Sequence, residues 1–228
     1  RDTDRSRGLG DVYKRQIFIK PGARMSVLKQ DQNQYDAYTI LDTVIMGNQH
    51  LYDVMKEKDA LYEKPDFSEE DGMRASELEA EFADMDGWEA ESDASKLLQG
   101  LGIPVELHYD LMANTDPRLK VKVLLAQALF GKPDIVMLDE PTNNLDIYHA
   151  TNLMKTVRKL CDELGKTIVL VLHEINYAAF YSDYICAFVD GKIAKFGTVE
   201  EVMTKEALTE IYKVDSVSYT HLRAHETD

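Results

Sequence analysis

Helical hydrophobic spacing dominates the first half of the chain. Apolar residues recur every three or four positions between residues 39 and 62, which predicts helix. The acidic stretch 63–95 carries Ser68 and Asp71 at the spacing of a capped helix start. Residues 77–96 predict a further helix, broken near an Asp-Gly pair. This pattern is typical of a solvated helical hairpin.

The second half has a different pattern. Continuous apolar runs at residues 135–138 and 167–172 predict strands buried on both faces. A helical stretch from 148 to 164 lies between them, and Gly165 fits its C-cap. Strand, helix and strand at this spacing predict a βαβ unit with parallel strands.

Shorter elements flank this unit. Residues 17–29 predict two short strands around a Pro-Gly turn, and residues 120–129 predict a compact helix. Residues 184–196 predict a hairpin turning at Asp190-Gly191, and residues 199–212 predict one or two closing helices. The predicted fold class is therefore α/β, with a mostly parallel sheet and an inserted helical arm.

Composition narrows the functional classes. The 228 residues include 26 Lys and Arg against 41 Asp and Glu, a net charge of −15, which argues against direct DNA binding. Two cysteines, Cys161 and Cys186, fit a reduced cytoplasmic protein. The sequence has no apolar run near the roughly 20 residues that span a bilayer.

The DNA sequences that would encode the two ends of the chain are related to each other. Residues 6–16 (SRGLGDVYKRQ) and 217–227 (VSYTHLRAHET) correspond to one DNA string and to its reverse complement read in a shifted frame. They resemble a translated transposon-end adapter of sequencing libraries. We therefore expect residues 1–16 and 217–228 to be artefacts outside the fold.

The strongest chemical motif is IVMLDEPTNNLD, residues 135–146. Ligands of parallel sheets lie beyond the carboxyl ends of strands, where Asp139 and Glu140 stand. Asp139 can hold Mg²⁺, usually through water, and Glu140 can polarise an attacking water. His173 follows the next buried strand, so we expect it beside Glu140, where an imidazole can bind a γ-phosphate oxygen.

These residues resemble the Walker B motif, the D-loop and the switch histidine of ABC-type ATPases. The resemblance implies that Asp146, in the D-loop, belongs to the nucleotide site. Gln30, after Val27-Leu28-Lys29, resembles the Q-loop glutamine that reaches Mg²⁺ and the attacking water. An ordinary loop amide remains the alternative for Gln30.

Two other motifs of such ATPases depart from the expected pattern. The phosphate-binding string G-x-x-x-x-G-K-[ST] occurs nowhere in the 228 residues. Residues 115–119 (TDPRL) stand where the signature LSGGQ is expected, without its two glycines. We therefore expect Mg-ATP binding in the intact parent, and weak or no binding and no hydrolysis by this chain alone.

The chain resembles two ABC families. Residues 17–146 resemble the F subfamily, soluble ATPases that act on the ribosome, through SVLKQDQ, the acidic insertion 50–100, which is an arm in that family, and KVKVLLAQALFGKPDIVMLDEPTNNLD. Residues 147–215 resemble the ATP-binding subunit of iron–siderophore importers, through VLVLHEINYAAFYSDYICAFVDGKIAKFGTVEEVM. His173 is followed by Glu174-Ile175-Asn176, where an F-subfamily member would continue with Asp-Arg.

These resemblances imply an incomplete P-loop NTPase-like domain with three parts. Residues 17–49 hold core strands and the Q-loop, residues 50–100 the arm, and residues 101–215 the core with Walker B, D-loop and switch histidine. The first functional hypothesis is an F-subfamily, ribosome-associated ATPase. The alternatives are an importer subunit bound to a membrane permease, peripheral to the inner membrane, and a non-functional chimera joined within LDEPTNNLD. A second ABC ATPase domain is the expected partner in both functional hypotheses.

Overall fold

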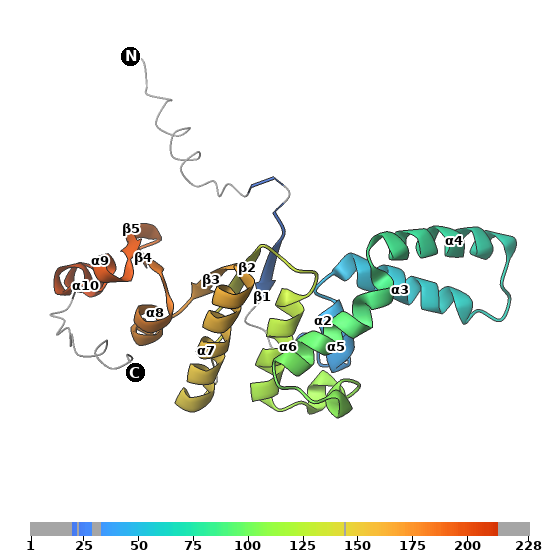
Figure 1. Ribbon diagram of the computed structural model, residues 1–228, viewed down its shortest axis with the longest axis horizontal. Coiled ribbons are helices and arrows are strands. Elements are labelled where there is room, and N and C mark those ends of the chain that lie inside the picture. Colours follow the sequence, from blue (N-terminus) through green and yellow to red (C-terminus); the bar gives the residue numbers. More distant parts are fainter. Residues whose placement is uncertain (1–19, 22, 29–32, 144, 214–228) are drawn as a thin grey trace, which may run out of the picture.

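The computed structural model describes residues 20–21, 23–28, 33–143 and 145–213. Figure 1 shows an elongated molecule with a central sheet, a helical hairpin at one end and a small strand pair at the other. Within the described ranges, none of the helices has the length and apolar character needed to cross a membrane.

Three parallel strands form the central sheet, in the order β1 (Met25–Leu28), β2 (Ile135–Asp139) and β3 (Thr167–Val171). The connection from β2 to β3 runs through α7 (Ile147–Leu164), which ends at Gly165 in the left-handed region with φ 59°. A glycine suits this backbone because it has no Cβ to clash. The predicted parallel βαβ unit and its C-cap are confirmed.

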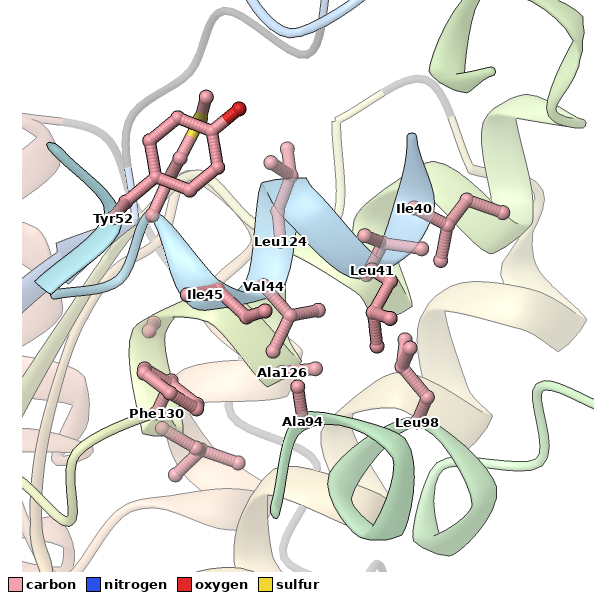
Figure 2. Packing of buried hydrophobic residues seen from close by; sticks show 14 of the residues in the cluster. Ile40, Leu41, Val44, Ile45, Tyr52, Ala94, Leu98, Leu124, Ala126 and Phe130 are labelled. Carbon is pink, nitrogen blue, oxygen red and sulfur yellow. The ribbon is translucent and has the colours of Figure 1, made fainter. Parts of the chain in front are cut away.

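The main hydrophobic core lies among three helices beside the sheet: α2 (Ile40–Ile45), α5 (Ala90–Gly100) and α6 (Pro117–Leu129). Figure 2 shows Ile40, Val44 and Ile45 of α2 packed against Ala94 and Leu98 of α5 and Leu124 of α6. A short 3-10 turn at Gly87–Glu89 directly precedes α5, and two more, at Val105–Leu107 and Met112–Asn114, connect α5 to α6.

The close approach of α2 to α6 depends on Gly47. A Cβ at this position would lie 2.1 Å from the carbonyl oxygen of Gln127 and 3.0 Å from Cβ of Phe130. The glycine also separates α2 from α3, so the stretch 39–62, which we predicted as helical, forms two helices. The apolar spacing continues through the break because both helices contribute to the same core.

The arm is a pair of helices, α3 (Gln49–Tyr62) and α4 (Glu69–Asp84). Ser68 and Asp71 form the predicted capping box, which starts α4. The helix continues from there to Asp84, so the separate start that we predicted at residue 77 is wrong. Asp86, with φ 55°, accounts for the predicted break before α5.

A buried lysine links the two helices of the arm. Lys58 of α3 is 8% exposed, and its Nζ lies 4.0 Å from the ring centre of Phe82 and 4.2 Å from that of Trp88. Its Nζ also lies 3.5 Å from Oε1 of Glu79 on α4. An ammonium group held between two aromatic rings is stabilised by their electron-rich faces. This contact therefore joins α3, α4 and the turn that follows.

The carboxyl-terminal elements are smaller. The helix α8 (Ile175–Tyr181) leads to β4 (Tyr184–Val189) and β5 (Lys192–Thr198), an antiparallel pair that turns at Asp190 and Gly191 with φ 51° and 72°. Two helices follow, α9 (Val199–Val202) and α10 (Lys205–Tyr212). The predicted hairpin and closing helices are confirmed. Of residues 17–29, the structure describes only the second strand, β1, and the first lies outside the described residues.

The prediction that β2 and β3 are buried on both faces is wrong. In β2 the buried residues are Val136 and Leu138, and the alternate residues are only partly buried. In β3 the exposed fractions of Val169 and Val171 are 40% and 43%. An apolar run shows that a strand avoids water, but the helices that would cover its second face need not lie in the same stretch of chain.

Candidate functional site

The predicted acidic residues lie at the carboxyl edge of the central sheet. Asp139 is the last residue of β2 and pairs in register with Val171 of β3. Glu140 follows with φ 47°, and its backbone N–H donates to the carbonyl oxygen of Val171 at 3.1 Å. Left-handed backbone is costly for a residue with a Cβ, and such strain is common at functional sites. The turn points Glu140 away from the line of the strand.

Two side chains contact the Glu140 carboxylate. Its Oε1 contacts Nε2 of His173, and its Oε2 accepts a hydrogen bond from Nδ2 of Asn143. The glutamate side chain is 15% exposed, whereas that of His173 is 72% exposed. The sequence prediction that Glu140 and His173 lie together is therefore confirmed by geometry.

A second contact joins the two loops of this edge. Thr142 Oγ1 donates to Oε2 of Glu174 at 3.4 Å, which ties the loop after β2 to the residue after His173. Thr142 is 5% exposed, so its hydroxyl lies in the protein rather than in solvent. We did not predict a role for Thr142, Asn143 or Glu174. Asn143 and Thr142 belong to the recognised motif, whereas Glu174 has only its position beside His173 as a signal.

Asp146 lies at the amino end of α7 and caps it. Its Oδ1 accepts from the backbone N–H of His149 at 2.9 Å, and its Oδ2 lies 2.7 Å from Nδ1 of the same histidine. The backbone hydrogen bond from His149, and then that from its ring, lower the pKa of the Asp146 carboxyl. The carboxylate is thus committed to the helix start, and this is a structural task beside the nucleotide role that the D-loop resemblance implies.

Gln30 lies outside the described residues. The segment in place of the signature is described, and Asp116 caps α6 there with Pro117 as the first helical residue. Asp116 accepts from the side chain and then the backbone N–H of Arg118, and these bonds lower its pKa. A carboxylate occupies the helix start here, where a glycine-rich loop would leave backbone amides open to a phosphate.

The site fits the two parts of Mg-ATP unequally. Mg²⁺ is usually bound through one or two carboxylates, water and phosphate oxygens, and Asp139 offers such a carboxylate at the sheet edge. The triphosphate does not fit the described residues, because the sequence lacks the phosphate-binding string G-x-x-x-x-G-K-[ST] and the Asp146 carboxylate occupies the start of α7. Glu174 directly precedes α8 but does not cap it through its side chain. Among the described residues, no group of three or more His, Cys, Asp or Glu could hold a metal on its own.

Solved structures of ABC proteins share this fold. A metal-chelate type ABC transporter in an inward-facing conformation aligns over 92% of this chain and 73% of its own, with a TM-score of 0.64 and 18% identity. The ATP-binding cassette MJ0796, a dimer bound to ADP and Pi, aligns over 85% of this chain and 67% of its own, with a TM-score of 0.54 and 20% identity. The chain therefore has the fold of an ABC-type ATPase.

Curated sequence relatives of the chain carry names of the same class of protein. The uncharacterized ABC transporter ATP-binding protein YkpA of Bacillus subtilis is 51% identical over 168 residues, which are 74% of this chain and 29% of that protein. The probable ATP-binding protein YbiT of Escherichia coli O157:H7 is 40% identical over 82% of this chain and 35% of its own length. No protein-family model matches the chain.

Importer subunits match a shorter part. The petrobactin import ATP-binding protein FatE of Bacillus anthracis is 48% identical over 92 residues, 40% of this chain and 37% of that protein. The chain thus spans about a third of the length of the curated relatives that it matches.

Proposed function

We propose that this chain contributes the hydrolytic edge of an ABC-type ATPase site. The observation that carries the proposal is the contact between Glu140 and His173 at the carboxyl end of the parallel sheet. A glutamate at this position can accept a proton from a water molecule, and the histidine and Asn143 hold the carboxylate in one orientation. Asp139 is the proposed Mg²⁺ ligand. Bound Mg-ATP would supply the phosphoryl group and a neutralising cation.

Another ABC domain, or a segment of this protein outside the described residues, is proposed to bind the triphosphate of the nucleotide, since the described residues do not fit it. The fold match to a dimeric ATP-binding cassette with bound ADP and Pi supports the proposal that two such domains pair. These proposed roles predict that removing the Glu140 charge slows turnover by the assembled site without unfolding the chain.

Mixing experiments test this role. FatE, purified at full length, is mixed with excess wild-type chain, with Glu140→Gln or with the control Glu163→Gln on α7, and the hydrolysis of Mg-ATP is measured. We expect the contribution of the chain to fall about a hundredfold in Glu140→Gln, the usual size of a general-base effect, and to be unchanged in the control. Equal rates with all three proteins, each folded by circular dichroism, would refute the role of Glu140.

At a finer level, we propose an ATP-binding subunit of an importer of the iron–siderophore kind. The names of several relatives support this alternative better than the F-subfamily hypothesis that we placed first. They include petrobactin importers from B. anthracis and B. subtilis and an iron(3+)-hydroxamate importer from B. subtilis. The proposed partner is a membrane permease, and the proposed location is peripheral to the inner membrane.

The helical arm is the observation that favours the F-subfamily hypothesis, since that resemblance implies ribosome association. The names of the relatives give the ribosome no support. Sedimentation with purified ribosomes and co-purification with a petrobactin permease in membranes separate the two hypotheses. Binding to the permease alone supports the importer, and binding to ribosomes alone supports the F subfamily. Binding to neither supports the third hypothesis, a chimera joined within LDEPTNNLD.

A further inference from the structure

Four charged or titratable side chains lie in a row between the start of α6 and the start of α7. At α6, Arg118 donates to Asp116 from Nε at 2.9 Å and from Nη2 at 2.8 Å. At α7, Nδ1 of His149 lies 2.7 Å from Oδ2 of Asp146. The two pairs meet where Nη1 of Arg118 lies 3.5 Å from Nε2 of His149. We call this set the helix-start link: Asp116, Arg118, His149 and Asp146.

The chemistry of its two partners decides where the His149 ring carries hydrogen. A guanidinium group has N–H donors and no acceptor, so Nε2 of His149 must accept the hydrogen bond from Arg118. An ionised carboxylate only accepts, so Nδ1 must carry a hydrogen and donate it to Asp146. His149 therefore joins the two helices as a neutral imidazole with its hydrogen on Nδ1. A second proton can bind only at Nε2, where it takes the lone pair that Arg118 uses.

The other charged members of the helix-start link keep their charge near neutral pH. Hydrogen bonds from the side chain and then the backbone of Arg118 lower the pKa of Asp116, and the Asp116 side chain raises the pKa of Arg118. The pKa of Asp146 is lowered in the same way by His149. Tyr148 of α7 also faces the imidazole, edge to face, at 5.2 Å between ring centres. Histidine is the side chain whose charge ordinarily changes between pH 5 and 8.

We propose that His149 is a proton-sensitive link between the segment at the start of α6 and the loop that ends at Asp146. In its neutral state the ring bridges the two helices. In its protonated state the hydrogen on Nε2 faces the hydrogens on Nη1 of Arg118, and the two positive groups repel. The Nδ1–H still donates to Asp146, whose carboxylate then pairs with a charged ring. Protonation thus turns a contact between helices into a contact within α7.

The position of the helix-start link decides what it controls. It ties the segment 115–119 to the loop after β2, the loop in which Glu140 lies. The four side chains are between 32% and 61% exposed, so water screens each contact and the expected effect is modest. The link therefore adjusts how firmly the two loops are joined and does not hold the fold together. This inference does not rest on the proposed ATPase role.

A double-mutant cycle on the full chain tests the link. Arg118→Met removes the donors and keeps the aliphatic stem, and His149→Phe removes both ring nitrogens and keeps a planar ring. The equilibrium constant of unfolding in urea is measured for the wild type, both single variants and the double variant, at pH 8 and at pH 5. Such a cycle separates the interaction of two side chains from their individual effects. The control cycle pairs Arg118→Met with His50→Phe, since His50 contacts Glu81 on the arm.

At pH 8 we expect Arg118 and His149 to stabilise the folded chain jointly by about twofold in the equilibrium constant, the usual size for an exposed contact. At pH 5 this coupling should disappear or reverse, because two positive groups then face each other. In His149→Gln the amide oxygen can accept from Arg118 at either pH, so the coupling of this variant should be the same at both. The control cycle should show no coupling at either pH.

Nitrogen-15 NMR of the imidazole is a second measurement, and it does not depend on unfolding. At pH 8 the His149 ring, assigned by comparison with His149→Gln, should carry hydrogen on Nδ1 and none on Nε2. Three results would overturn the proposal: hydrogen on Nε2 at pH 8, no coupling between Arg118 and His149 at pH 8, or equal coupling at both pH values. All three are independent of the mixing experiment on Glu140, so failure of either proposal leaves the other intact.

Discussion

The helical region around α2, α5 and α6 and the strand-rich region after α7 bury their apolar residues to very different extents. In the first, Val44, Leu98 and Leu124 are at most 2% exposed. In the second, Phe188 and Phe196 are 65% and 68% exposed, and they lie on the same face of the β4–β5 pair. Similar apolar content thus gives a closed core where helices surround one another and open surfaces where strands have one covered face. Substitutions in the two regions should therefore differ in their effect on stability.

The largest expected effect is in the closed core. Leu124→Ala should lower the free energy of unfolding by about 3 kcal/mol, since it removes a buried side chain that lies among several helices. Val169→Ala, at a 40% exposed strand position, should cost less than about 1 kcal/mol. Chemical denaturation of both variants measures the contrast. Similar costs would mean that the strand region is packed as tightly as the helical one.

The next largest effect on stability is expected where α2 packs closely on α6. Gly47→Ala should cost about 2 kcal/mol, because the new Cβ meets the carbonyl oxygen of Gln127 on α6. Gly100→Ala, at the end of α5 where a Cβ meets nothing within 4 Å, should instead stabilise the chain by about 0.5 kcal/mol. Thermal midpoints of the two variants should move in opposite directions. A shift of both in one direction would contradict the close packing of α2 on α6.

A smaller effect is expected in the arm. Ser68→Ala removes the hydroxyl that accepts from the backbone N–H of Asp71 at 3.1 Å, and it should destabilise α4 by about 1 kcal/mol. Ser76→Ala, an exposed change inside the same helix, should stay within about 0.5 kcal/mol of the wild type. Hydrogen exchange along α4 measures both. Equal exchange in the two variants would show that the cap does not hold the helix start.

The smallest effect is a pH dependence at the same cap. A hydrogen bond from Lys64, and then bonds from Ser68, lower the pKa of Asp71 from 3.8 to about 2. Since the folded pKa lies below its ordinary value, the stabilisation is present above pH 3.8 and is lost as the pH falls through about 2.

Acid titration of the arm checks this dependence. Asp71→Asn should remove the loss of α4 helicity in this acid range, and Lys64→Gln should shift it upward because the largest cause of the low pKa is gone. Glu70→Gln, a matched loss of charge in the same first turn, should leave it in place. A titration that is unchanged in Asp71→Asn would contradict the assignment.

Much of the fold could be predicted because its signals are local. Continuous apolar runs separated by a helical stretch are enough to predict β2, α7 and β3, and the left-handed residues at Gly165 and Gly191 mark the ends of elements. The break at Gly47 was not predicted, because it depends on how near α6 comes. The exposed face of β3 was not predicted either, since a hydrophobic run does not show which elements cover each face of the strand.

The candidate site could be predicted in part for the same reason. Strand ends at one sheet edge bring Glu140 and His173 together whatever the loops do, and this was expected from the motif alone. The link between Thr142 and Glu174 depends on the left-handed turn at Glu140, which no local sequence signal announces. Contacts that depend on loop conformation are thus the features of the site that could not be predicted from the sequence.

The Lys58 contact has a practical consequence. Trp88 is the single tryptophan of the chain, and its ring meets Phe82 edge to face at 5.1 Å between centres while the ammonium group of Lys58 lies over it. Indole emission therefore reports on the base of the arm and on no other part of the protein. Separation of α3 from α4 would change this fluorescence even while the rest of the molecule stayed folded, so Trp88 is an intrinsic optical probe of the arm.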